Sequence, residues 1–167
     1  QAALAQALQK GLARIDAQML LLHTLGRPTD ERAWLITHDS DALPPDLQAH
    51  YATLCQRRLG GEPVAYLTGS KAFSGLELRV DARVLDPRPD TETLVDWALE
   101  VLVPCTAPRV LDLGTGSGAI ALALQKERPD ARVLAGDASL DALTVAQANA
   151  QRLGLPNGIA GRCAADT

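Results

Sequence analysis

The sequence predicts an α/β protein in which a small helical domain and a β-hairpin precede a parallel, doubly wound sheet. Three observations carry this prediction. Apolar side chains recur at helical spacing up to about residue 60, and residues 71–80 alternate around Ser74-Gly75. From Arg109 onward the pattern becomes strand, glycine-rich loop, helix, strand and helix. We therefore expect a helical domain at 1–60, a linker with the hairpin at 61–85, and the first part of the α/β domain at 86–167.

The composition excludes several classes of protein. The chain has 167 residues, 47% of them hydrophobic, which is enough to bury a full core. Its three cysteines are odd in number and far apart, which is typical of a reducing compartment and not of a disulfide scaffold. No apolar run approaches the roughly 20 residues that span a bilayer. We expect a cytoplasmic, monomeric protein that does not bind membranes.

The charge pattern argues against direct binding to nucleic acid. There are 16 basic and 20 acidic side chains, for a net charge of −4, and the basic ones form no stripe along the chain. Only 3% of the residues are aromatic, so few platforms exist for stacking bases.

The helical region divides at glycine and proline. One apolar stripe is interrupted at Gly11, and a second one, with Ile15, Met19 and Leu22, ends at Gly26. A third helix follows Pro44-Pro45 and ends at Gly60, with one face formed by Leu47, Tyr51, Leu54, Cys55 and Arg58.

The hairpin is followed by an extended loop and another helix. Pro87-Arg88-Pro89 fixes the loop, and Asp90 is placed to cap the helix. The inward-facing side chains of this helix are expected to be Leu94, Trp97, Ala98, Val101 and Leu102.

The α/β region begins with a short buried strand at 110–113 and continues with a glycine loop, a helix at 119–126 and a second strand at 133–135. Ser139 is expected to cap the next helix, which ends at Gly154. Only a weak third strand around Ile159 follows. Because a parallel sheet needs more strands, with helices on both faces, the domain is expected to be incomplete at its C-terminal side.

The glycine loop is the most informative motif, and two ligands fit it. It comprises Gly114, Thr115, Gly116, Ser117 and Gly118, and it follows Asp112. The spacing Gly114-x-Gly116-x-x-Ala119 satisfies the fingerprint for NAD, with Asp137 as the acid that binds ribose. Asp112 instead favours S-adenosylmethionine, since a carboxylate repels a pyrophosphate but attracts the ammonium and sulfonium of the methyl donor.

Four segments together resemble the HemK/PrmC group, the peptide chain release factor N5-glutamine methyltransferases. They are Gly61 to Gly69, Phe73 to Leu76, Pro87 to Glu92, and the loop from Asp112 to Gly118 with Asp137. The second and third fit the family's hairpin and its P-R-P-x-T-E stretch. The resemblance implies a helical domain that helps dock the release factor and a Rossmann-like methyltransferase domain that uses S-adenosylmethionine. The methyl group then goes to the side-chain amide of the glutamine in the factor's Gly-Gly-Gln motif.

The resemblance also implies which site residues this chain supplies. The donor site is formed by the loop residues 114–118 with Asp112 and Asp137, and Asp166 matches an acidic turn beside the adenine. Arg88, Pro89 and Glu92 are expected near the pocket, although Arg88 and Glu92 also have the spacing of an ion pair. The family's amide-binding N-P-P-Y motif does not occur in these 167 residues. No catalytic residue is therefore expected here, and we expect the chain alone to be inactive.

Two positions depart from the family pattern, and three alternatives stay open. Asp86 and Gly136 stand where the family has apolar residues, which predicts a buried carboxylate and a loosened strand. The alternatives are an NAD-dependent oxidoreductase, a non-catalytic donor-binding module, and a methyltransferase for another protein or a nucleic-acid amine. No cysteine and histidine cluster has metal-ligand spacing, and the three histidines lie outside the donor region.

Overall fold

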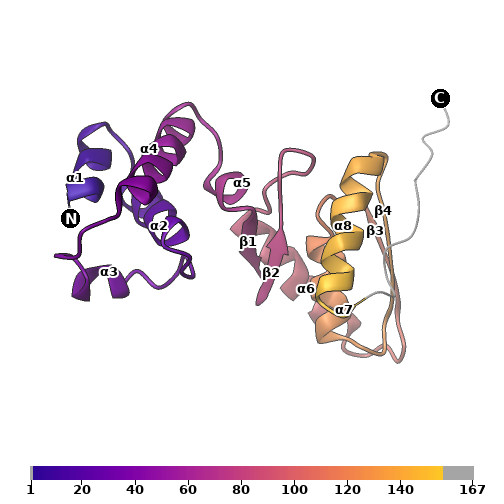
Figure 1. Ribbon diagram of the computed structural model, residues 1–167. Coiled ribbons are helices and arrows are strands. Elements are labelled where there is room, and N and C mark those ends of the chain that lie inside the picture. The colour runs from indigo at the N-terminus through magenta and orange to yellow at the C-terminus, as the bar shows by residue number, and fades with distance from the viewer. Residues whose placement is uncertain (1, 156–167) are drawn as a thin grey trace. The chain divides into compact units, whose positions relative to one another are not determined.

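The computed structural model describes residues 2–155, which form two compact units. The first unit ends at Thr68 and the second begins at Gly69. Figure 1 labels the helices and strands of both. The domain boundaries predicted at residues 60 and 85 stay predictions. Within residues 2–155, no helix has both the length and the apolar character needed to cross a membrane.

The first unit is entirely helical. Its helices are α1 (Ala2–Gln9), α2 (Arg14–Thr24), α3 (Trp34–Thr37), α4 (Pro45–Leu59) and α5 (Val64–Thr68). As predicted, α4 begins at proline and buries Tyr51, Leu54 and Cys55. The predicted stripe of α2 is partly correct: Leu22 is fully buried, whereas Ile15 is 55% exposed. Ala17, Leu20 and Leu21 line the core.

Polar contacts hold α2 and α4 together beside this apolar core. The Tyr51 hydroxyl donates a hydrogen bond to the Ala17 carbonyl over 3.1 Å. Arg58 Nε lies 2.7 Å from Asp16 Oδ2, and both side chains are largely buried. The aromatic ring thus fills the core while its hydroxyl keeps a partner, as a buried tyrosine requires.

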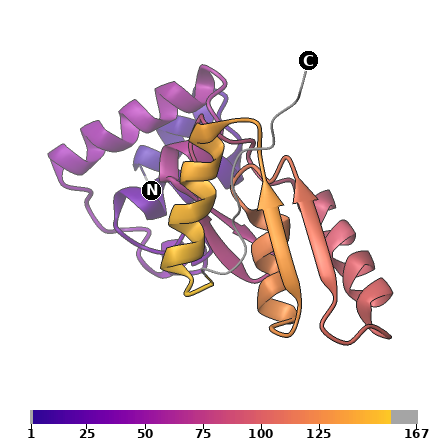
Figure 2. The ribbon, with the colours of Figure 1, turned by 90° about the vertical axis from the view of Figure 1, so that its right-hand side faces the viewer.

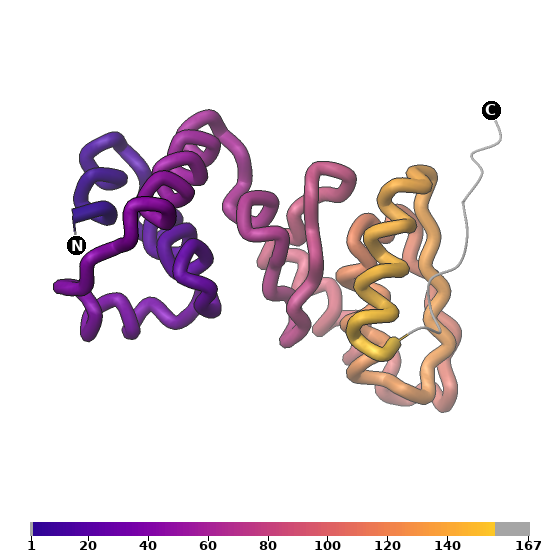
Figure 3. The backbone as a smooth tube through the Cα atoms, in the orientation of Figure 1, coloured from indigo at the N-terminus to yellow at the C-terminus, as the bar shows by residue number. Residues whose placement is uncertain are grey.

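The second unit opens with the predicted hairpin, β1 (Ser70–Phe73) and β2 (Leu76–Arg79), joined by the two-residue turn Ser74-Gly75. Phe73 and Leu78 are almost fully buried. Figure 3 traces the chain from β2 through residues 80–91 into α6 (Glu92–Leu102). The turn is held at both sides, since the Glu92 carboxylate accepts the Ser74 N–H and the Lys126 ammonium donates to the Gly75 carbonyl.

The prediction for α6 was wrong in two respects. A 3₁₀ turn at Pro89–Thr91 leads into the helix, and no side chain, including that of Asp90, caps it. The buried residue is Val95, whereas Leu94, Trp97 and Val101 are 46%, 60% and 53% exposed. Sequence spacing identified an apolar stripe correctly but could not tell which edge of it meets α7 (Ala119–Glu127).

The strands β3 (Arg109–Leu113) and β4 (Arg132–Gly136) form a parallel pair with Asp112 opposite Ala135 and Leu113 opposite Gly136. They match the predicted strands with one or two residues added. α8 (Leu140–Arg152) follows β4, and the Ser139 hydroxyl accepts the Ala142 N–H, which confirms the predicted cap. The weak strand expected around Ile159 lies outside the described residues.

Helices cover one face of this sheet within residues 2–155. α6, α7 and α8 lie on the same side of the two strands (Figures 1 and 2). Val133 and Ala135 point toward them and are buried, while Leu111, Leu113 and Leu134 point the other way and are more than half exposed. Parallel sheets are normally covered on both faces. The described residues therefore form one of the two helical layers of a doubly wound sheet.

Arg128 and Asp130 connect the loop before β3 to the loop before β4. The Arg128 guanidinium donates to the carbonyls of Leu102 and Cys105 and forms a forked pair with the Asp130 carboxylate. That carboxylate also accepts the Ala107 N–H. These hydrogen bonds, chiefly those from Arg128, lower the pKa of Asp130 from 3.8 to about 2.

We expect Asp130→Asn to destabilise the second unit above pH 4 and to matter less in acid. A depressed carboxyl pKa contributes stability that is complete above the unfolded value and is lost as the pH falls through the folded value. The difference in the free energy of unfolding between wild type and variant should therefore shrink between about pH 4 and pH 2. Urea unfolding across this range measures it. Because the pair is exposed, high salt should also reduce the difference, and a pH-independent difference would contradict the assignment.

Candidate methyl-donor site

The glycine loop lies at the carboxyl end of β3, directly beside the end of β4. Both Gly114 and Thr115 donate their N–H groups to the Gly136 carbonyl, over 2.9 and 3.1 Å. Gly136 is the last residue of β4, and its carbonyl anchors the loop. Contrary to what the sequence suggested, it does not interrupt the interior of the strand. The crevice at the carboxyl ends of parallel strands is the usual ligand site of such sheets.

Asp137 joins the loop to the start of α8. One of its carboxylate oxygens accepts the Gly116 N–H over 2.9 Å, and the other accepts the Ser139 N–H over 2.9 Å. These two bonds fix the orientation of the carboxylate, and each oxygen keeps a further lone pair. Asp137 can thus hold a pair of ribose hydroxyls without reorganising.

Asp112 lies within β3, opposite Ala135 and two residues before the loop. Its Oδ2 accepts a hydrogen bond from the Thr115 hydroxyl over 2.7 Å, and its side chain is half-buried. A carboxylate held here gives the base of the loop a negative charge. That charge favours a ligand with a cationic group and disfavours a pyrophosphate.

The five loop residues divide into three groups. A Cβ placed on Gly114 or Gly116 would meet no atom within 4 Å, so these residues face open space. Thr115 and Ser117 are 7% and 3% exposed, so their side chains point inward and only their backbone lines the opening. A Cβ on Gly118 would lie 3.0 Å from Leu122 Cδ1 and 3.3 Å from Ala146 Cβ. Gly118 thus serves close packing between α7 and α8.

The Pro-Arg-Pro segment lacks the ion pair that its spacing allows, and its place near the donor pocket stays a prediction. Arg88 and Pro89 are exposed, and Glu92 binds the backbone of the hairpin turn. Among residues 2–155 no ion pair forms between Arg88 and Glu92, so the i,i+4 pair suggested by the spacing is absent. Glu92 therefore positions the hairpin, while the Arg88 side chain is available to a ligand or partner.

Asp86 is largely buried, as its place in the sequence predicted, and it has found a partner. Lys71 Nζ on β1 lies 3.2 Å from Asp86 Oδ1, with the two side chains 27% and 16% exposed. The contact is an ion pair by distance but lacks hydrogen-bond geometry, so this oxygen is buried without a hydrogen bond. The pair replaces the apolar contact expected in relatives.

We expect Asp86→Ala to lower the free energy of unfolding by about 1–2 kcal/mol, because it leaves the largely buried Lys71 ammonium without a counter-charge. The double variant Lys71→Met with Asp86→Leu should regain or exceed wild-type stability, since apolar groups of similar size remove both desolvation penalties. Urea unfolding of Lys71→Met, Asp86→Leu and the double variant tests the coupling. Additive losses would show that the side chains do not interact.

One polar residue of this region was missed by sequence reasoning. Asn149 lies within the inward face of α8, beside Ala146 and Ala150, and is fully buried. The available signal was an amide at a position where the helical period expects an apolar residue. Asp166, predicted beside the adenine, lies outside the described residues. Within the described part of the chain, no group of three or more potential metal ligands occurs.

Comparisons with known proteins agree with this architecture. Residues 1–69 match the family model of the PrmC N-terminal domain, and residues 91–164 match that of the methyltransferase small domain. A structure of coclaurine N-methyltransferase aligns with 99% of this chain and 49% of that chain, at 21% identity and a TM-score of 0.40, which is too low to support an argument. The fold and the site thus define a methyltransferase domain preceded by a helical domain.

Curated relatives indicate which methyltransferases this chain resembles. Release factor glutamine methyltransferases from Bordetella pertussis, Burkholderia pseudomallei and Escherichia coli K12 are 53%, 49% and 46% identical over 144, 142 and 146 residues. These alignments cover 86%, 85% and 86% of this chain and 52%, 49% and 50% of the relatives. The chain thus carries a PrmC N-terminal domain and a methyltransferase small domain, and its curated relatives are release factor glutamine methyltransferases. It spans about half the length of the curated relatives it matches.

Proposed function

We propose that the chain binds S-adenosylmethionine at the carboxyl ends of β3 and β4, and that the protein methylates the Gly-Gly-Gln glutamine of peptide chain release factors. The donor part of the proposal is carried by one observation. Two carboxylates, Asp112 and Asp137, bind a loop in which Gly114 and Gly116 face open space. The acceptor part is supported by the curated relatives and by the helical domain that matches the PrmC N-terminal model.

The residues fit the methyl donor on chemical grounds. Its ammonium and sulfonium are cationic, and Asp112 supplies a negative charge at the base of the loop. Its ribose carries two hydroxyls, and Asp137 presents two oriented acceptor atoms. When bound, the donor supplies an electrophilic methyl group. The loop backbone approaches the ligand closely because Gly114 and Gly116 place no side chain in the opening.

The contribution of these residues to catalysis is positioning. An amide nitrogen is a weak nucleophile because its lone pair is delocalised into the carbonyl. Methyl transfer to it therefore depends on how well the nitrogen is aligned with the methyl group of the donor. A rigid donor site fixes one half of that alignment. Asp137 and Gly136 provide the rigidity, since each binds two backbone N–H groups that lie at or beside the loop.

Two measurements test the proposal. Isothermal titration calorimetry of the 167-residue chain should detect binding of S-adenosylmethionine and S-adenosylhomocysteine, and no binding of NADH. A chimera that continues this chain with the remaining half of the Bordetella pertussis relative should add one methyl group to the Gly-Gly-Gln peptide of a release factor, as read by mass spectrometry. The chain without that half should transfer none.

The outcomes separate the two parts of the proposal. Binding of NADH without S-adenosylmethionine would overturn the donor assignment. Donor binding together with a chimera that leaves the glutamine unmodified would overturn the acceptor assignment. A release factor with glutamine replaced by alanine in the motif is the control for the site of methylation.

A further inference from the structure

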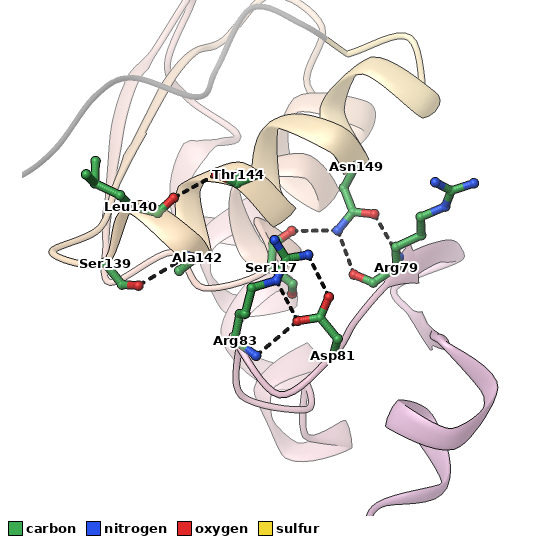
Figure 4. A network of polar contacts seen from close by, with 9 residues as sticks. All are labelled: Arg79, Asp81, Arg83, Ser117, Ser139, Leu140, Ala142, Thr144 and Asn149. Carbon is green, nitrogen blue, oxygen red and sulfur yellow. Dashed lines mark hydrogen bonds and ion pairs between the residues drawn. The ribbon is translucent and has the colours of Figure 1, made fainter.

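Asn149 on α8 has every polar atom of its side chain engaged. Its Oδ1 accepts the Arg79 N–H over 2.7 Å, and its Nδ2 donates to the carbonyls of Arg79 and Ser117, each over 2.9 Å. Figure 4 shows the amide between these two backbone segments. The side chain is fully buried. Three satisfied bonds offset the cost of placing an amide in the interior of the unit.

The orientation of this amide is fixed by its partners. Oxygen faces the single N–H donor, and nitrogen faces two carbonyl acceptors. Rotating the amide by half a turn would set its oxygen against the carbonyls and leave the Arg79 N–H facing an NH₂ group. Asparagine is therefore required chemically, because neither aspartate nor leucine, though similar in size, supplies both a donor pair and an acceptor.

The hairpin presents a free edge to α8. In an antiparallel pair of strands, hydrogen-bonded and non-hydrogen-bonded residue pairs alternate. Phe73 and Leu76, which flank the two-residue turn, form a hydrogen-bonded pair, so Ser70 and Arg79, three pairs further on, form a non-hydrogen-bonded one. The N–H and C=O of Arg79 consequently point away from β1, where Asn149 binds both. The Glu77 carbonyl faces the same way and accepts a hydrogen bond from Arg152, three residues after Asn149 on α8.

The third bond of Asn149 reaches the glycine loop. Ser117 lies between Gly116, whose N–H donates to Asp137, and Gly118, whose backbone has a φ of 83°. Elsewhere the loop is bound by Asp112, Gly136 and Asp137 at the ends of β3 and β4, by the Gly118 N–H within it, and by the Leu122 N–H of α7, which donates to the Gly118 carbonyl. The bond to Ser117 thus joins the loop to α8 and, through the same amide, to the hairpin.

We propose that Asn149 is a positioning residue for the methyl donor, which couples the docked hairpin to the conformation of the glycine loop. This inference rests on the donor site proposed above. Holding the Ser117 carbonyl keeps the Gly116 N–H aimed at Asp137 and keeps the opening in front of Gly114 and Gly116 clear. Loss of the amide leaves the Arg79 N–H and the carbonyls of Arg79 and Ser117 without this partner, and the loop is then free to shift.

The test compares Asn149→Ala with Arg152→Ala, which removes a hairpin contact without touching the loop. In the 167-residue chain without ligand, Asn149→Ala should speed hydrogen exchange at Gly116 and Gly118 by about 10-fold relative to amides in the middle of α7. Its affinity for S-adenosylhomocysteine by calorimetry should fall by about 10-fold. Arg152→Ala should change both quantities less than 2-fold.

The measurements distinguish failure of the Asn149 proposal from failure of the donor-site proposal. If the wild-type chain does not bind S-adenosylhomocysteine, the donor site is wrong, but the exchange rates still decide whether Asn149 holds the loop. If Asn149→Ala unfolds, Asn149→Asp keeps the size and the acceptor for Arg79, and should show the same loss of affinity. A variant that is less stable globally but retains wild-type affinity and loop exchange overturns the proposal, because Asn149 would then serve only packing.

Discussion

Replacing Asp137 with alanine is expected to reduce the affinity for S-adenosylmethionine by about 100-fold or more. The carboxylate would accept hydrogen bonds from two ribose hydroxyls, and bonds to a charged group contribute about 1.5–3 kcal/mol each. The same change also leaves the N–H groups of Gly116 and Ser139 without their acceptor. We therefore expect a loss of about 1–3 kcal/mol in stability as well.

Calorimetric titration and urea unfolding measure the two effects separately. Asp141→Ala is the matched control. Like Asp137→Ala it removes one negative charge, but from an exposed side chain in the first turn of α8. It should leave donor affinity within 2-fold of wild type. Asp137→Asn keeps one acceptor oxygen and should fall between wild type and Asp137→Ala. Unchanged affinity in Asp137→Ala would refute the ribose role.

Replacing Gly118 with alanine is expected to lower the free energy of unfolding by about 2–5 kcal/mol. The residue has a φ of 83°, which costs a side chain about 1–2 kcal/mol. Its new methyl group would also lie 3.0 Å from Leu122 Cδ1 and 3.3 Å from Ala146 Cβ, and overpacking of this kind costs about 1–3 kcal/mol. Urea unfolding measures the sum.

Gly116→Ala is the matched control within the same loop. Its φ is 55° and its Cβ would meet no atom within 4 Å, so only the backbone cost applies and the fold should survive. The methyl group would, however, project into the opening and should abolish donor binding. Equal free energies of unfolding for the two variants would show that the close packing of α7 on α8 adds nothing to the cost of a side chain at Gly118.

Local patterns predicted most elements of this protein because they depend on neighbours in the sequence. Helix α4 begins at proline, α8 begins at the Ser139 cap, and the hairpin turns at Ser74-Gly75, each as expected. The glycine loop between β3 and α7 indicated the candidate donor site for the same reason, since a strand, a tight turn and a helix follow one another directly in the chain.

Predictions that needed to know what an element packs against were less successful. The inward face of α6 is set by its contact with α7, and the helical period alone favoured Leu94 and Trp97, which are exposed. Glu92 has the spacing for an ion pair with Arg88, yet it binds the backbone of Ser74, which is 18 residues away in sequence.

The sequence by itself determined the α/β class, the glycine loop with its two acids, and the family resemblance. All of these rest on residue types at short, fixed spacings, where bond geometry and backbone preference decide. Only the tertiary structure decided that Asn149 links Arg79 to Ser117, that Asp86 pairs with Lys71, and that Gly136 anchors the loop. Each of these joins residues 15 to 70 positions apart, so their partners depend on how the elements pack, and no local period records that.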